Sequence, residues 1–136
     1  MSSIATIAVS GLKAASQRLE VSASNIANAR STGALPDANG TLPAGAPKAF
    51  APLELVQSDV AGGGTQTIIT RSSQATTASY DPSAPFANKD GLVASPNVDL
   101  AQEMISQLLA KYSFAANARV LKASDEMSRT VIDMKV

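Results

Sequence analysis

Residues 2–29 read SSIATIAVSGLKAASQRLEVSASNIANA, a stretch with no proline and one glycine. Apolar and small side chains recur in it at steps of three and four residues, namely Ala5, Ala8, Leu12, Ala15, Leu19, Ser22 and Ile26. This spacing is typical of one face of an amphipathic helix, and its larger members lie seven residues apart, as in a coiled-coil seam. The pattern predicts a helix of about 40 Å over residues 1–30.

A second periodic segment covers residues 98–136 and contains no glycine or proline. It follows Pro96, and either Asn97 or Asp99 is expected to cap it, with Glu103 near the positive end of the helix. A helix of this extent is about 55 Å long, whereas a compact domain of this size measures roughly 28 Å across. We therefore expect it to project from its subunit or to be covered by other subunits. Its apolar stripe is Ala101, Ile105, Leu108, Leu109, Tyr112, Ala116, Val120, Ala123, Met127, Val131 and Met134.

The middle of the chain, residues 31–97, holds all seven prolines and seven of the eight glycines. Strand-like residues at 50–57 and 65–71 predict a short β-hairpin, although Pro52 weakens the first strand or confines it to an edge. Turns are expected at 36–40 and 80–83. The predicted fold class is mainly α with a small β element: two long terminal helices packed as a coiled-coil-like pair, with a loop-rich middle, forming one structural unit.

Composition narrows the classes of function. Alanine supplies 25 residues and aromatic residues only 4%, so the core is thin and the chain is expected to bury part of its surface against partners. Eleven basic residues balance eleven acidic ones, which argues against a nucleic-acid partner. The chain has no histidine and no cysteine, so we expect no enzyme activity, no catalytic residues, no metal site and no cofactor. No apolar run is long enough to insert into a membrane.

Two asparagines, Asn25 and Asn28, mark the end of the first predicted helix. Amide side chains at such a place either cap the helix or, when buried, fix the register in which helices pair. Capping is the more common role, and the sequence leaves both open.

The string Ser24-Asn25-Ile26-Ala27-Asn28-Ala29, followed by Ser31-Thr32-Gly33, resembles the signature that ends the N-terminal helix in the bacterial flagellar rod and hook family. The second half of the chain is similar to the proximal rod type of that family in three places. These are Tyr80-Asp81-Pro82-Ser83 with Asp90-Gly91-Leu92-Val93, Pro96-Asn97-Val98-Asp99 leading to Glu103-Met104, and Ala116-Asn117 with Val120-Leu121. The resemblance spans nearly the whole chain. A paralogue serving a second flagellar system is an alternative within the family.

The resemblance implies a structural subunit of the proximal rod, a torque-transmitting periplasmic shaft of the flagellar basal body. It implies export from the cytoplasm through the flagellar type III apparatus without a cleaved signal peptide. The implied partners are other copies of the chain, the other proximal rod proteins and the adaptor that joins rod to ring. The rival interpretation is a non-polymerising helical binding module or secretion adaptor. The residues predicted to form the assembly interface are Leu12, Leu19, Asn25, Ile26, Asn28, Ile105, Leu108, Tyr112, Asn117, Val120 and Met127.

Overall fold

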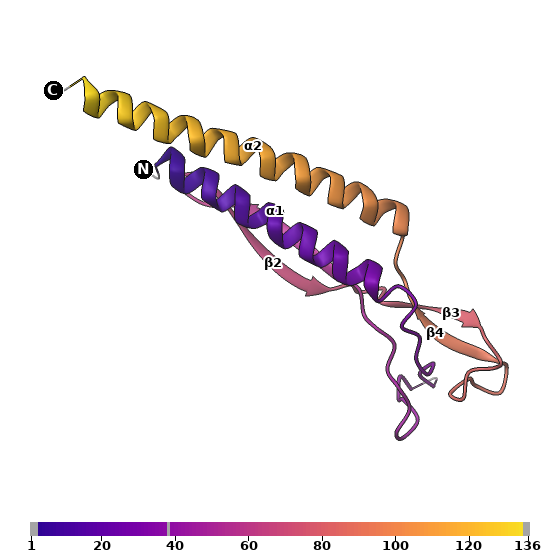
Figure 1. Ribbon diagram of the computed structural model, residues 1–136. Helices are drawn as coiled ribbons and strands as arrows, with labels where there is room; N and C mark the ends of the chain where they lie inside the picture. The colour runs from indigo at the N-terminus through magenta and orange to yellow at the C-terminus, as the bar shows by residue number, and fades with distance from the viewer. Residues whose placement is uncertain (1–2, 38, 135–136) are drawn as a thin grey trace.

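The computed structural model describes residues 3–37 and 39–134 and shows an elongated molecule built on two long helices (Figure 1). Residues 1–2 and 135–136 of the predicted helical ranges, and Ala38 in the turn predicted at 36–40, lie outside the described residues. The elements in chain order are α1 (Ile4–Ala27), β1 (Leu53–Asp59), β2 (Thr65–Arg71), β3 (Thr76–Tyr80), β4 (Leu92–Pro96) and α2 (Leu100–Asp133).

Helix α1 begins and ends close to the predicted limits. The Ser3 hydroxyl oxygen accepts a hydrogen bond from the Thr6 N–H at 3.2 Å and so caps the N-terminus. Asn28 follows the last helical residue, and its side-chain amide donates to the Ser24 carbonyl at 2.9 Å. Asn28 therefore has the capping role that was one of its two expected roles.

Helix α2 is capped by Asp99, whose carboxylate accepts hydrogen bonds from the N–H groups of Ala101 and Gln102 at 2.9 and 3.2 Å. Asn97, the other candidate cap, instead donates to the Gln74 carbonyl at 3.2 Å. Glu103 lies in the first turn of α2, as expected.

The two helices pack side by side and run in opposite directions (Figure 1). At about 1.5 Å per residue, the 24 residues of α1 span about 36 Å and the 34 residues of α2 about 51 Å. Figure 1 shows the C-terminal turns of α2 (yellow) extending past the first turn of α1 (indigo). These turns therefore lack a partner within the described part of the subunit.

The interface between the helices consists of small and polar side chains. Ala8, Ala15 and Ser22 of α1 are buried, as is Ala110 of α2. The Ser22 hydroxyl donates to the Glu103 carbonyl of α2 at 2.9 Å. Ala8, Ala15 and Ser22 are the small members of the seam predicted on α1, and small residues let two backbones approach closely.

The apolar stripe of α2 lies outside this interface. Its predicted seam residues remain exposed: Ile105, Leu108, Tyr112, Val120 and Met127. The sequence left open whether these residues contact α1 of the same subunit or a neighbouring subunit. Within the subunit, α1 meets the adjacent face of α2, which carries Ser106, Ala110 and Asn117.

Strands β1 and β2 form the predicted antiparallel hairpin, with Leu55 opposite Ile69 and Val56 opposite Ile68. Strand β2 has the predicted limits, but β1 begins at Leu53 rather than at residue 50. Pro52 has no N–H to donate to a strand ladder, and only its carbonyl takes part, accepting from the Ser72 N–H at 2.8 Å. The hairpin packs along α1.

A second antiparallel sheet, formed by β3 and β4, was not predicted from the sequence. Strand β4 holds the buried Val93 and Ala94 at its centre, and Ala94 exchanges two hydrogen bonds of 2.9 Å with Gly33. All residues of β3 are exposed, so it carries no alternating apolar pattern by which it could be recognised. The loop between these strands contains the turn predicted at 80–83, where the Asp81 carboxylate accepts from the Ser83 N–H at 3.2 Å.

Gly11 marks a close approach of the helices, because a Cβ atom built there would lie 2.4 Å from Oδ1 of Asn117. In an open helix, Gly→Ala adds about 1 kcal/mol of stability. We expect Gly11→Ala to give that gain only in an Asn117→Ala background, because in the wild type the new methyl group displaces the Asn117 amide. Denaturant unfolding of the wild type, the two single variants and the double variant measures how strongly the effects of Gly11→Ala and Asn117→Ala on stability depend on each other. Equal gains in both backgrounds would show that Asn117 does not limit the space at Gly11.

Candidate assembly site

The structure separates the eleven predicted interface residues into three groups by exposure. The exposed group is Leu19, Ile105, Leu108, Tyr112, Val120 and Met127, the half-buried group is Leu12, Ile26, Asn28 and Asn117, and Asn25 is buried. Their part in assembly remains a prediction. The exposed group offers the most surface for contact with another molecule, from 46% of Val120 to 64% of Tyr112.

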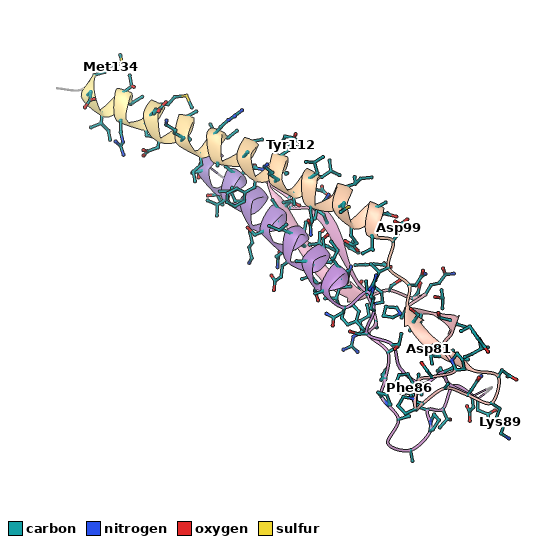
Figure 2. The ribbon with its side chains drawn as sticks, turned by 45° about the vertical axis from the view of Figure 1, so that its right-hand side comes forward. Asp81, Phe86, Lys89, Asp99, Tyr112 and Met134 are labelled. Atoms are coloured by element: carbon teal, nitrogen blue, oxygen red, sulfur yellow. The ribbon has the colours of Figure 1, made fainter. Side chains whose placement is uncertain are left out.

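Six of the exposed apolar residues of α2 form one line along the helix, here called the α2 stripe: Ile105, Leu108, Leu109, Tyr112, Val120 and Met127. Figure 2 shows side chains projecting along the whole of α2, with Tyr112 near the middle and Met134 near the end, and no described element over its outer side. Tyr112 is 64% exposed and Ile105 59%. Burying one large apolar side chain is worth about 1.5–3 kcal/mol, so this face favours association.

A groove runs along α1 between the β1–β2 hairpin and α2. Its first part has a volume of about 690 Å³. The apolar groups that line it come from the two helices, among them Ile7, Ala14, Leu109, Tyr112 and Ala116, and the hairpin contributes Gln57, Gly64 and Thr65. Its second part, of about 620 Å³, lies nearer the start of α2 and is more polar, with lining residues that include Ser22, Asn25, Asp99, Gln102 and Glu103. Arg18 lines both parts. The groove thus continues from an edge of the α2 stripe onto α1.

Three side chains of α1 position the hairpin wall of this groove. The Ser10 hydroxyl oxygen accepts from the Thr65 N–H at 3.1 Å, at the start of β2. Arg18 donates to the Gln57 side-chain oxygen at 3.0 Å, and Gln17 is hydrogen-bonded to Thr67. The glycines at 62–64 of the connecting turn all have positive φ, which glycine adopts without strain. These hydrogen bonds fix where the hairpin lies along α1.

Asn25 joins three elements at the other end of the hairpin. Its amide nitrogen donates to the Leu53 carbonyl at 2.9 Å and to the Glu103 carboxylate at 2.7 Å. Its amide oxygen accepts from the Leu53 N–H at 2.8 Å. Asn25 does not cap α1, so the capping role expected for it is wrong, and its contacts match the register-fixing alternative.

Sequence reasoning missed a smaller apolar pair on the outer face of the hairpin. Val56 and Ile68 lie opposite each other and are 54% and 59% exposed. Alternate residues of a strand point to opposite faces, and Leu53 and Leu55 on the other face are half-buried. Leu55 and Val56 are adjacent apolar residues of one strand, and this alone could have indicated an apolar residue on each face of the hairpin.

The described ranges, 3–37 and 39–134, show no group of three or more acidic residues placed to hold a metal ion. Neither α1 nor α2 combines the length and the apolar content needed to cross a membrane.

Two protein families match the two terminal segments of the chain. The family described as "Flagella basal body rod protein" matches residues 6–34, and "Flagellar basal body rod FlgEFG protein C-terminal" matches residues 89–134. These ranges contain most of α1 and all of α2, the two helices that border the groove.

Three curated relatives each bear the name flagellar basal-body rod protein FlgC. The Salmonella typhimurium protein is 36% identical over 89% of this chain and 87% of its own length. The Escherichia coli O6:H1 protein is 37% identical over the same shares, and that of Agrobacterium fabrum is 32% identical over 98% of this chain and 94% of its own. The chain therefore belongs to the FlgC family of flagellar basal-body rod proteins.

Proposed function

We propose that this protein is a structural subunit of the proximal rod in the bacterial flagellar basal body and acts by assembly rather than by catalysis. The observation that carries the proposal is the exposed α2 stripe, which lies on a helix longer than its partner in a chain of the FlgC family. A folded subunit that leaves the six large apolar side chains of the α2 stripe uncovered is suited to a place among other subunits.

Neighbouring subunits cover the α2 stripe in the proposed assembly, and helices of those neighbours enter the apolar part of the groove. The groove supports this because Leu109 and Tyr112 belong both to the stripe and to its lining. A contact that joins one face of a subunit to a different face of the next repeats along an axis and builds a shaft. Close packing of helices then resists twisting, which is what the transmission of torque requires.

The partners proposed for these surfaces are other copies of the chain, other proximal rod proteins and the rod-to-ring adaptor. The proposed place of the assembled protein is the periplasmic rod. The chain reaches it as an unfolded substrate of the flagellar type III export apparatus, without cleavage of a signal peptide. The thin core supports export in an unfolded state, because few large side chains have to be exposed again when the chain unfolds.

The alternative, a helical binding module or secretion adaptor that never polymerises, has less support. Relatives named as rod proteins align with this chain over 87% or more of their own length, and that name supports the structural subunit.

Deletion of the gene tests the proposal directly. We expect the deletion strain to lose swimming, and its basal bodies to lack rods in electron micrographs, with both restored by a plasmid copy. Intact rods and normal swimming, in a strain shown to contain no second rod gene of this type, would contradict the proposed function. Recovery of the protein only outside purified basal bodies would favour the binding module.

A further inference from the structure

The repeat of small residues alone defines the axial register of α1 against α2 weakly. Ala8, Ala15 and Ser22, buried small residues of α1, are spaced seven residues apart. Sliding the helix by seven residues places Ala8 where Ala15 stood and Ala15 where Ser22 stood, so the small-residue stripe meets α2 again. The same slide places Ile4 where Gly11 stood, opposite Asn117, and removes the hydrogen bond from Ser22 to Glu103, so the register depends on specific contacts beside the stripe.

Asn25 is, beside Ser22, a buried polar residue of α1 that distinguishes these registers, and it makes the larger number of hydrogen bonds. Its side chain is 2% exposed, and each of its three hydrogen bonds goes to another element of the fold. A buried amide without partners is costly, so any register that separates Asn25 from Leu53 and Glu103 is penalised. Seven residues earlier in the chain stands Arg18, which has a different shape and charge and cannot replace the amide. A single buried asparagine specifies register in coiled coils for the same reason.

We propose that Asn25 is a positioning residue that fixes the register of α1 against both α2 and the β1–β2 hairpin. It acts on assembly through these elements and not by touching a neighbouring subunit, because it is enclosed by its own fold. The hydrogen bond to Glu103 locates the start of α2, and the bonds to Leu53 locate the start of β1. These two sets of hydrogen bonds together set the position of the α2 stripe relative to the groove. The claim that this position matters for assembly rests on the proposed function, whereas the claim that Asn25 fixes the register does not.

An engineered disulfide measures the register in the purified full-length protein. The natural chain has no cysteine, so the two cysteines introduced by Gly11→Cys and Asn117→Cys can form only one disulfide within the subunit, the one between them. A Cβ at Gly11 would lie 2.6 Å from Cγ of Asn117, which puts the two Cβ atoms within about 4 Å, the span that a disulfide requires. A slip by one helical turn, about 5.4 Å, removes this proximity.

Asn25→Ala in this background is expected to slow disulfide formation at least tenfold while the helical circular dichroism signal persists. Asn97→Ala is the matched control, because that amide donates one hydrogen bond, to the Gln74 carbonyl, and none to α1 among the described residues. The control is expected to form the disulfide at the parental rate. An Asn25→Ala protein that forms it as fast as the control, or that loses its helices altogether, would overturn the proposal.

A donor–acceptor exchange provides a second measurement. Asn25→Asp places a carboxylate against the Glu103 carboxylate and should block the disulfide. Adding Glu103→Gln restores a donor between the helices, so the double variant should regain a rate within threefold of the parent. No recovery would show that the side chain at 25 does not act through Glu103. These rates are read without assembly, so a failed deletion test would count against the proposed function alone.

Discussion

Leu108→Glu is expected to leave the subunit folded and to abolish its incorporation into rods. Leu108 lies in the α2 stripe and is 50% exposed, so the isolated subunit tolerates a carboxylate there. In the proposed assembly a neighbour covers this position. The variant then loses about 1.5–3 kcal/mol of apolar burial and places an unpaired charge in the interface, at a further cost of several kcal/mol.

Each subunit contact is thus weakened by a factor of at least about a thousand, since 1.4 kcal/mol corresponds to tenfold. The expected result is a non-motile strain whose purified basal bodies lack the variant protein, while circular dichroism and thermal unfolding of the purified chain match the wild type. Lys111→Glu is the control, because it introduces the same side chain at a polar, exposed position of α2 and changes the net charge by more. Normal swimming of Leu108→Glu would show that the α2 stripe is not covered in the rod.

Gly33→Ala is expected to cost about 3 kcal/mol of folding free energy, at the upper end of the usual penalty for overpacking. A Cβ at Gly33 would lie 2.1 Å from the Ala49 nitrogen and 2.5 Å from the Lys48 carbonyl carbon. These are backbone atoms, so no side-chain rotation relieves the clash. The strand contact to Ala94 and the hydrogen bond of 2.8 Å from the Ala34 N–H to the Pro47 carbonyl fix the backbone on both sides.

Gly45→Ala separates this effect from the general cost of replacing a glycine in a loop. Gly45 has a φ of +77° and open space around its Cα, so its substitution should cost only about 1–2 kcal/mol of left-handed backbone strain. Denaturant unfolding of the two variants should rank Gly33→Ala as clearly the less stable. Equal losses would mean that the segment at 47–50 moves aside without cost.

The sequence predicted those parts of the fold that depend on local interactions. The spacing of apolar residues placed both helices, Ser3 and Asp99 begin them close to the expected positions, and the β-branched run at 65–71 located β2 to the residue. Local patterns succeed here because helix periodicity, capping and strand propensity are properties of neighbouring residues. The motifs of the flagellar rod and hook family were readable in the same way, and the relatives confirm them.

The tertiary structure decided which faces meet. An apolar stripe indicates that a helix face packs against something, but it does not show whether the packing partner belongs to the same subunit. In this structure α1 packs against the small and polar face of α2. Strand β4 of the second sheet also forms a bridge to Gly33, some sixty residues away in the chain, and no local pattern encodes that contact. Capping and register-fixing were both open to Asn25 and Asn28, and only the fold shows which residue has which contacts. Asn28 meets its own helix and caps it, whereas Asn25 meets β1 and α2, because a residue's partners are fixed by packing between elements distant in sequence.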